Sequence, residues 1–546
     1  MKKHLSLAAL ALSWGALAQG PAGAVPGEVL PAGLDAAQYR SHVKTLSSDA
    51  FEGRLPATRG ETLTLDYLQG QFQALGLKPG FGNGFRQPVP LMAITAAPDM
   101  QLKLGDLVLD YKEDMVVHSR HPQKQVELKD SELVFVGYGI HAPELGWDDY
   151  AGLDVKGKTV VMLINDPGFA TGDARFQGKA MTYYGRWDYK YAEASRQGAA
   201  GALIVHQSAP ASYGWSVIQS SWTGPQYDLA GNDQPRVKVE GWISLDAAHR
   251  LFGQAGLDFD KLSARAAKAP TQADLKARAA VTVRSRVEKT VSHNLMAVLP
   301  GQTDETLIVT AHWDHIGKDE GLGGDQIYNG AMDNATGTAG LLSLAASLAP
   351  LYQGDDKPRR SIAFLAVTAE EQGLLGSSHY VANPAVPLAR TVANINMDSL
   401  SVYGPTRDMV VVGKGKTSIE HWLHKAAQAQ GRTLVGSSRP EAGGYYRSDH
   451  FNFAKAGVPA LYAGGGSQPW DETVASYREQ MKARLKGCYH GPCDEFQADW
   501  DLRGALADLA LFHQVLAELA VSEQWPKWQP GAEFKRPSAT TAQSAR

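Results

Sequence analysis

The stretch TLIVTAHWDHIG, residues 306–317, decides the fold. Its opening run TLIVTA is apolar and rich in β-branched residues, which is typical of a buried strand. His312 and Asp314 follow this run directly. A histidine at a strand end is more often structural than a metal ligand, so this stretch alone predicts a strand and leaves its chemistry open.

From His293 onward, predicted strands alternate with predicted helices. The alternation predicts an α/β core, a three-layer mixed central sheet with helices on both faces. In such sheets, ligands gather where loops leave the carboxyl ends of the strands. The predicted strands are Asn294 to Leu299, Thr306 to Ala311, Ser361 to Thr368, Val392 to Met397, Met409 to Val412 and Ala460 to Ala463, and the predicted helices are Gly337 to Ala349, Gly373 to Ala382, Ser418 to Gln430 and Leu502 to Glu523.

Carboxylates end two further apolar runs. SIAFLAVTAEEQGLLGS, residues 361–377, places Glu370 and Glu371 after a strand, and TVANINMDSLS, residues 391–401, places Asp398 after another. Adjacent glutamates are usually just solvated. However, neighbouring side chains on an extended backbone point in different directions, so one can bind a metal while the other faces a substrate. Metal-dependent hydrolysis needs such a division between ligand and base.

A tight turn precedes one predicted helix. In NGAMDNATGTAGLLSLA, residues 329–345, Asp333 and Asn334 occupy this turn. The carboxylate of Asp333 either caps the helix or bridges two cations, and this segment alone leaves both interpretations open.

The two cysteines of the chain, Cys488 and Cys493, lie in GCYHGPCDEF, residues 487–496. In an exported protein this pair favours a small disulfide loop over free thiols or a cysteine-type zinc site. His490 lies inside the loop, and a disulfide would stiffen the backbone around it. Together with the residues after the strands, His490 completes a set of nitrogen and carboxylate ligands without thiolates, which suits a hydrolytic zinc site with an open position.

Six motifs in order resemble the M28 family of co-catalytic zinc peptidases: HWDHIG, GAMDNATG, AEEQGLLGS, NMDS, YYRSDHFNFAKAGVPAL and CYHGPCD. The resemblance covers roughly residues 293–523. It implies two Zn²⁺ ions per chain, about 3.5–4 Å apart across one shared carboxylate. The implied ligands are His312 and Asp398 for one ion, Glu371 and His490 for the other, and Asp333 between both.

The resemblance also implies catalytic roles. Glu370 is the implied general base, and Asp314 is the implied partner that orients His312. Tyr445 has the spacing of a family tyrosine that steadies the oxyanion, with its neighbour Tyr446 as the alternative and plain packing as a third interpretation. 

Arg447 is expected to help hold the substrate. His315 and His450 are expected to support the site rather than to bind metal, because five other residues fill the implied ligand positions.

The implied reaction is hydrolysis of peptide bonds, with release of N-terminal amino acids from peptides. One alternative is a carboxypeptidase of the same family, which would want a cluster of arginines for the substrate carboxylates, and Arg447 alone does not make that cluster. A non-catalytic binding protein on this fold is a second alternative. A single-zinc glutaminyl cyclase is disfavoured by the complete ligand set.

The first residues resemble a secretory signal. Lys2 and Lys3 precede an apolar run from about Leu5 to Leu17, and cleavage is expected after Ala18 or Ala24. The apolar run is shorter than the roughly 20 residues of a spanning helix, so we expect no membrane anchor after cleavage. The expected location is therefore the periplasm or the medium.

The chain is long enough for more than one core. We expect a signal peptide in 1–24, an N-terminal part of the peptidase domain in 25–130, an insertion in 131–285, the zinc-peptidase core in 286–525 and a frayed tail in 526–546. The insertion resembles the protease-associated domain, a smaller β-rich α/β unit, in WDDYAGLDVKGKTVVMLINDPG (147–168) and GRWDYKYAEASRQGAAGALIVH (185–206). The net charge of -4 gives no electrostatic reason to expect nucleic acid as a partner, so peptides are the expected partners.

Overall fold

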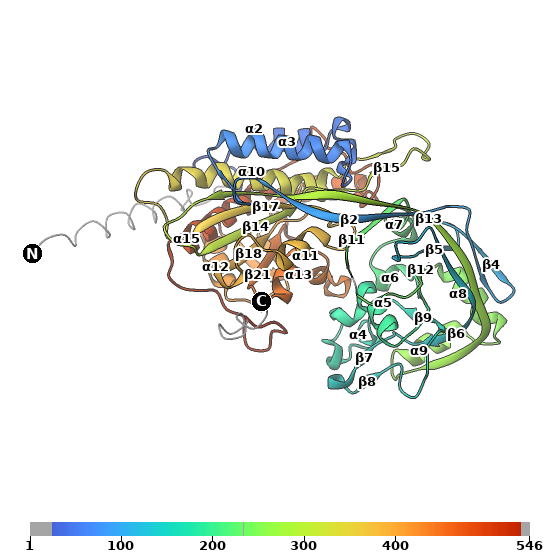
Figure 1. The fold of residues 1–546 in the computed structure, drawn as a ribbon. Helices are drawn as coiled ribbons and strands as arrows, with labels where there is room; N and C mark the ends of the chain where they lie inside the picture. Colours follow the sequence, from blue (N-terminus) through green and yellow to red (C-terminus); the bar gives the residue numbers. More distant parts are fainter. Residues whose placement is uncertain (1–24, 233, 537–546) are drawn as a thin grey trace, which may run out of the picture. The chain divides into compact units, whose positions relative to one another are not determined.

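The computed structural model describes residues 25–232 and 234–536, which fold into two compact units (Figure 1). Of the described residues, unit 1 comprises those up to Val89, Ser292–Ser437 and those from Ser448 onward, and unit 2 comprises those in Pro90–Val291 and Ser438–Arg447. The signal peptide expected in residues 1–24 lies outside the described residues, so it stays a prediction.

A mixed sheet forms the centre of unit 1. Strand β14 (Thr306–His312) lies between β17 (Ser361–Val367) and β18 (Thr391–Asn396) and pairs in parallel with both. Their carboxyl ends therefore lie at the same edge of the sheet. The other pairs are β18 parallel to β21 (Ala460–Gly464), β21 antiparallel to β19 (Asp408–Val412), β19 parallel to β20 (Thr433–Gly436), β17 antiparallel to the end of β13 (Gln272–Leu299), and β13 antiparallel to β1 (Lys78–Pro79).

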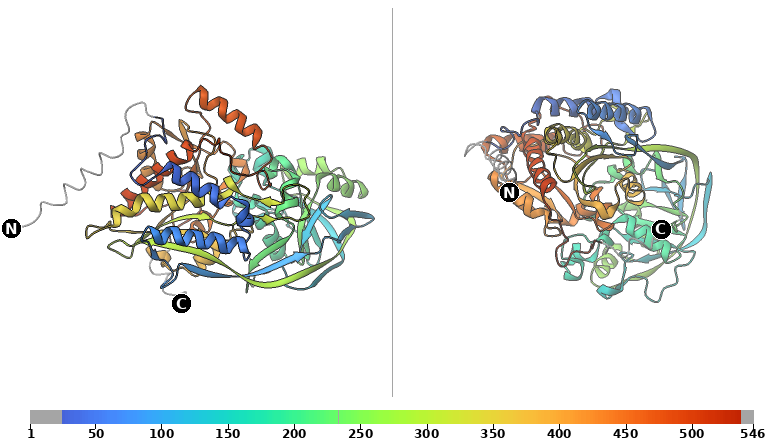
Figure 2. Two further views of the ribbon diagram at one scale, coloured as in Figure 1. Left: turned by 90° about the horizontal axis from the view of Figure 1, so that it is seen from above. Right: turned by 60° about the vertical axis from the view of Figure 1, so that its left-hand side comes forward.

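Helices cover both faces of this sheet, as the sequence predicts. In Figure 1, α10 (Thr336–Leu348) lies above β14 and β17, whereas α11 (Leu375–Ala382) and α13 (His450–Lys455) lie below them. Seen from above in Figure 2, α10 lies between α2 and α3. The remaining bounds in unit 1 are α2 (Ala36–Leu46), α3 (Arg59–Ala74), α12 (Ile419–Ala429), α14 (Glu472–Arg484) and α15 (Arg503–Val521).

Strand β14 is buried along its whole length, and its mainly apolar sequence follows from this two-sided cover. Val309 belongs to the large core beneath α2, α3 and α10, whereas its neighbour Ile308 belongs to the smaller core with Tyr380 of α11 and Phe453 of α13. Every residue of β14 is buried. Parallel strands covered on both faces lose the alternation of polar and apolar residues that half-exposed strands show.

Helix α15 is long and apolar enough to cross a membrane by length and composition, but 67% of its most apolar window is buried inside the protein. Its buried side chains, among them Leu509, Phe512 and Leu516, belong to the same core as α10. A helix that is apolar around most of its surface is expected at the centre of a large core. We therefore interpret α15 as a core helix of unit 1.

Unit 2 is built around a second mixed sheet. Parallel pairing joins β6 (Gln125–Val136), β9 (Thr159–Leu163), β10 (Gly201–Val205) and β12 (Val239–Ile243). The identification of this unit as a protease-associated domain stays a prediction. Its other main elements are β2 (Arg86–Ala96), β3 (Gln101–Leu104), β4 (Leu107–Asp110), β5 (Met115–His118), β11 (Pro225–Leu229), α5 (Trp187–Arg196), α7 (Trp215–Ser221), α8 (Leu245–Gln254) and α9 (Phe259–Ala266).

Unit 2 begins before residue 131, where the sequence suggests the insertion to start. The reason is strand pairing: β3 and β5 lie ahead of that position, and they pair with β13 and β12. Short half-exposed strands such as β4 carry a weak sequence signal, which is why composition alone places the boundary later.

Part of the C-terminal tail does not fray as expected. The indole Nε1 of Trp528 donates to the carbonyl of Gly457 at 3.0 Å. Arg536 donates from Nη1 to the carbonyl of Thr391 at 3.0 Å and from Nη2 to that of Val392 at 2.8 Å. Residues 526–536 are therefore held against unit 1 by side-chain hydrogen bonds that a polar composition does not reveal, and the rest of the tail lies outside the described residues.

Truncating the core beneath α10 should destabilise unit 1. Leu344 of α10 is fully buried, so Leu344→Ala is expected to lower the free energy of unfolding by about 2–5 kcal/mol through lost burial and a cavity. Val521, at the end of α15, is 47% exposed, and Val521→Ala should stay within about 0.5 kcal/mol of wild type. Urea denaturation followed by tryptophan fluorescence measures both. Equal losses of unfolding free energy in the two variants would contradict the assignment of Leu344 to this core.

Candidate metal centre

The charged residues that follow the strands of unit 1 meet at one edge of its sheet. His312 is the last residue of β14, Glu370 and Glu371 follow the end of β17, and Asp398 follows the end of β18. The three strands are parallel neighbours, so their carboxyl ends bring these side chains together. The sequence predicts this grouping, and the structure has it.

Asp333 reaches the same place from a turn rather than from a strand. The turn Ala331–Ala335 immediately precedes α10, and the peptide bond between Asp333 and Asn334 is cis. The side-chain oxygen Oδ1 of Asn334 accepts from the backbone N–H groups of Gly337 at 2.9 Å and Ser399 at 3.1 Å. Asn334 therefore performs the capping for which Asp333 was the sequence candidate, and the Asp333 carboxylate is left to face the histidines.

The first cluster of possible ligands centres on His312. Its Nε2 lies 3.2 Å from Oδ1 of Asp333 and 3.3 Å from Oδ1 of Asp398. The ligand atoms of these three residues all lie within 4.8 Å of one another.

The second cluster centres on His490. Its Nε2 lies 3.4 Å from Oδ2 of Asp333 and 3.0 Å from Oε2 of Glu371. Asp333 thus presents one carboxylate oxygen to each histidine. This is the arrangement that a carboxylate shared by two cations requires.

The electrostatics of the two clusters favour cations. Burial opposes a charged His490, yet the carboxylates of Glu371 and Asp333 outweigh it and raise the pKa of the ring to about 10. Burial likewise opposes a charged His312, and Glu370 and Asp398 raise its pKa well above the usual value. Buried carboxylates in this number demand positive charge, from protonated histidines or from bound metal. Nitrogen and oxygen donors without thiolates fit zinc or a similar divalent ion.

Glu370 lies beside the clusters and is anchored through its backbone. Its carboxylate, with His312 and Glu371, forms another group whose ligand atoms lie within 4.8 Å of one another. Its N–H donates to Oδ1 of Asp314 at 3.1 Å. Burial raises the pKa of Glu370 well above the usual range, and the nearby carboxylate of Asp398 raises it further, although His312 acts in the opposite direction. A carboxyl group that readily holds a proton beside a metal site suits general acid–base work.

Asp314 contacts His312 differently from the sequence expectation. Nδ1 of His312 lies 3.1 Å from the backbone carbonyl oxygen of Asp314, but 3.9 Å from its carboxylate. A carbonyl oxygen can only accept, so Nδ1 carries the proton and Nε2 is left to face Asp333 and Asp398. The backbone of Asp314 thus orients the ring, and its carboxylate holds Glu370.

His315 supports Glu371. Its Nδ1 lies 2.6 Å from Oε1 of Glu371, while the other oxygen, Oε2, faces His490. This contact fixes the glutamate without occupying the oxygen that the second cluster uses. The ligand atoms of His315, Asp333 and Glu371 also lie within 4.8 Å of one another, so the supporting role of His315 stays a prediction.

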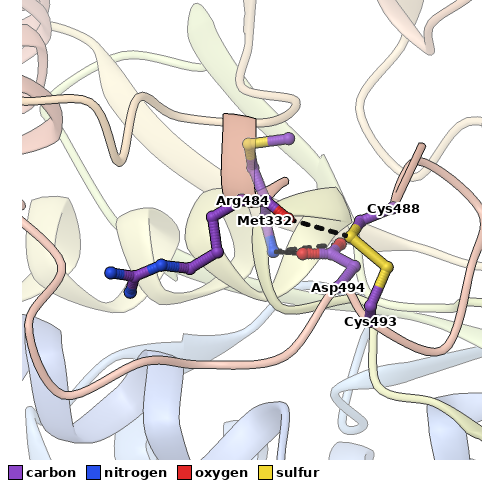
Figure 3. Close-up of a disulfide and its surroundings, with 5 residues drawn as sticks. All are labelled: Met332, Arg484, Cys488, Cys493 and Asp494. Carbon is purple, nitrogen blue, oxygen red and sulfur yellow. Dashed lines mark hydrogen bonds between the residues drawn. A yellow bond between two sulfur atoms is a disulfide. The ribbon is translucent and has the colours of Figure 1, made fainter. Parts of the chain in front are cut away.

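The loop that carries His490 is closed by a disulfide, as the sequence predicts. Cys488 and Cys493 are bonded, with their Cα atoms 5.1 Å apart (Figure 3). The carboxylate of Asp494 accepts the N–H groups of Met332, at 2.9 Å and 3.2 Å, and of Asp333, at 3.0 Å. Asp494 therefore ties this loop to the turn of Asp333. Sequence reasoning missed it, although an acid directly after the second cysteine was a visible signal.

Tyr445 and Arg447 lie in unit 2. The buried ring of Tyr445 meets that of Tyr446, with centroids 5.6 Å apart. Nη2 of Arg447 donates to the carbonyl oxygen of Ala211 at 2.9 Å and to Oγ of Ser212 at 3.0 Å. The roles of Tyr445 and Arg447 toward a substrate stay predictions.

Reducing the disulfide should weaken the second cluster. The chain has two cysteines, so a reductant acts on this loop alone. We expect the reduced protein, or the variant with both cysteines changed to serine, to lose bound zinc to a chelator about tenfold faster, because the backbone around His490 loses its closure. Thiol counting and metal analysis measure this. Equal rates for the oxidised and reduced protein would show that Asp494 holds the loop without the disulfide.

Comparisons with known proteins match the segment of the chain that contains most of these residues. Residues 294–513 match the model of peptidase family M28. An aminopeptidase of Pseudomonas aeruginosa is 26% identical over 220 residues, 38% of each chain, and Aminopeptidase YwaD of Bacillus subtilis is 31% identical over 191 residues, 33% of this chain and 38% of that protein. The chain thus matches well under two thirds of either relative.

A solved structure has a related fold. The aminopeptidase from Aneurinibacillus sp. strain AM-1 superposes with a TM-score of 0.53 at 20% identity, over 93% of this chain and 98% of that one. This likeness extends the relationship in fold to both units, whereas the sequence match concerns the segment that holds the metal centre. In residues 294–513 this chain therefore carries a domain of peptidase family M28.

Proposed function

We propose that this protein is a zinc metallo-exopeptidase that uses two Zn²⁺ ions to release N-terminal amino acids from peptides. The observation that carries the proposal is the Asp333 carboxylate, which presents Oδ1 to His312 and Oδ2 to His490. A site for one metal ion would not need a single carboxylate to present its two oxygens to two different histidines. The two relatives described above are named aminopeptidases, which supports this choice, although two other relatives are named probable glutamate carboxypeptidases.

The ligand assignment follows the two clusters. His312 and Asp398 would hold one ion, His490 and Glu371 would hold the other, and Asp333 would contact both. When bound, zinc supplies a Lewis acid and lowers the pKa of a coordinated water to about 7.

Glu370 supplies the proton transfers in this proposal. Its carboxylate would accept a proton from the attacking water and then give it to the amine that leaves. The hydrogen bond from the Glu370 N–H to Asp314 holds the base while the proton moves. Because the carbonyl of Asp314 also sets the tautomer of His312, one residue positions both a ligand and the base.

We also propose that the protein works in an oxidising compartment, the periplasm or the medium. The disulfide between Cys488 and Cys493 supports this, since structural disulfides persist outside the reducing cytosol. The apolar N-terminal run of the sequence agrees with such a location.

Removing the carboxylate of Glu370 should stop the chemistry and spare the metal. Glu370→Gln is expected to lower kcat by about 10²–10⁴-fold, the usual contribution of a general base, while both zinc ions stay bound. Steady-state kinetics and metal analysis of the same sample measure this. Glu479→Gln is the matched control, because that side chain is 74% exposed. Loss of both metals together with activity would instead place Glu370 among the ligands.

Mass spectrometry shows from which end of a peptide the protein removes residues. We expect the zinc-loaded protein to remove single residues stepwise from the N-termini of a mixed peptide library, and to leave N-acetylated copies intact, because acetylation removes the free amine. The Glu370→Gln protein, prepared identically, controls for a contaminating peptidase. Loss of C-terminal residues would assign a carboxypeptidase, and a metal-loaded protein that cleaves nothing would favour a binding protein.

A further inference from the structure

A segment of the N-terminal region with a strained backbone contacts the two stretches of chain that carry His312 and Asp333. In the stretch FEGRLPATRG, residues 51–60, Glu52, Gly53 and Arg54 have φ angles of 50°, 64° and 51°. Two of these three residues carry side chains, for which the left-handed region is uncommon. Consecutive residues in this region persist only where the surrounding structure holds them, and such positions gather at functional sites.

Gly53 shows how closely this segment approaches the chain that carries the ligands. A Cβ atom at Gly53 would lie 2.1 Å from the carbonyl oxygen of Gly317 and 2.7 Å from that of Tyr328. Gly317 follows the segment of His312 and Asp314, and Tyr328 precedes the turn of Asp333. Only a glycine permits this approach.

The buried guanidinium of Arg54, 1% exposed, is hydrogen-bonded to backbone carbonyls. Nε donates to Trp313 at 2.9 Å, and Nη2 donates to Gly330 at 2.9 Å. Nη1 donates to Asn329 at 2.7 Å and to Leu46 at 2.6 Å.

These acceptors belong to two segments that hold metal ligands. Trp313 lies between His312 and Asp314, and Gly330 directly precedes the Ala331–Ala335 turn of Asp333. In the reverse direction, the N–H of His315 donates to the carbonyl of Arg54 at 3.2 Å. One planar side chain thus fixes the spacing between the segment of His312 and the turn of Asp333.

The positive charge of Arg54 also suits a position near the acidic residues of the metal centre. The guanidinium stays protonated in proteins, and within the described part of the chain it donates its hydrogen bonds to carbonyls rather than to carboxylates. A buried charge without a directly paired carboxylate is costly unless nearby charges offset it. Burial lowers the pKa of Arg54 to about 10, and the nearby acids Asp494, Asp314, Asp333 and Glu371 act in the opposite direction.

We propose that Arg54 is a positioning residue of the metal centre: by binding the carbonyls of Trp313, Asn329 and Gly330 it sets the distance between His312 and the shared carboxylate of Asp333. This inference rests on the proposed function, because it concerns how the same two ions are held. Lysine cannot replace it, since an ammonium is a point charge without the planar fork that reaches several carbonyls at once.

The test compares zinc-loaded full-length Arg54→Lys and Arg54→Gln with wild type. Three quantities are measured: the rate at which a chelator removes zinc, the visible spectrum of the Co²⁺-loaded protein, and kcat and KM for a peptide. We expect both variants to release zinc about tenfold faster or more, as for other residues that orient ligands, with an altered Co²⁺ spectrum and a lower kcat at little-changed KM.

Arg59→Gln is the matched control. Arg59 belongs to the same stretch, but its side chain is 66% exposed and pairs with Glu52 at 2.9 Å, so this variant should keep wild-type zinc release. Gly53→Ala tests the positioning role independently, because the added Cβ atom displaces residues 51–60 while the guanidinium of Arg54 stays unchanged. This variant should also release zinc faster than wild type. It serves as the second variant if Arg54→Gln fails to fold.

The outcomes separate this inference from the proposed function. Wild-type zinc release and Co²⁺ spectra in Arg54→Lys, with only a lower melting temperature, would overturn the positioning role and leave a structural one. A wild-type protein that binds zinc but cleaves no peptide would overturn the proposed reaction, yet the metal measurements would still decide the role of Arg54. A wild-type protein that binds no zinc would overturn both.

Discussion

The carboxylate of Asp333 has one oxygen beside the ring of His312 and the other beside the ring of His490, and the rest of the centre is arranged around this division. Two oxygens of one carboxylate lie a fixed distance apart, so they set the separation of whatever positive charges they bind. Asp398 and Glu371 then complete one cluster each. Any displacement of the turn that carries Asp333 would disturb both clusters at once, which explains why so many contacts converge on that turn.

Three kinds of contact hold the turn, and each comes from a different part of the chain. Asn334 caps the helix that follows and bonds to the segment after β18. Asp494 accepts the N–H of Asp333 from the disulfide loop. Arg54 donates to Gly330 from the N-terminal region. The polar groups of a buried turn need hydrogen-bond partners, and here the partners also bring the candidate ligands together.

The buried sheet supplies the rigidity that this arrangement needs. Strand β14 is covered on both faces, by α10 on one side and by α11 and α13 on the other, so the backbone that ends in His312 has little freedom. Ligands placed at the ends of such strands can be packed among other charges at a low dielectric, where their interactions are strong. His490 lies in a loop rather than at the end of a strand, and the disulfide and Asp494 restrain this loop.

The sequence alone determined the residue types and their order. Apolar runs followed by His312, Glu371 and Asp398 predicted strands of a mixed central sheet with charged residues at their ends, because the apolar character of a strand is a local property of the sequence. It could not decide whether the side chain of Asp333 caps α10 or faces the histidines, or whether the carbonyl or the carboxylate of Asp314 contacts His312. It also did not reveal that β3 and β5 belong to unit 2. It also gave no sign that Arg54 hydrogen-bonds to Trp313 and Gly330, next to candidate ligands more than two hundred residues later in the chain. Those outcomes depend on which hydrogen-bond donors and acceptors become neighbours after folding, and only the tertiary structure brings groups so distant in sequence within hydrogen-bonding distance.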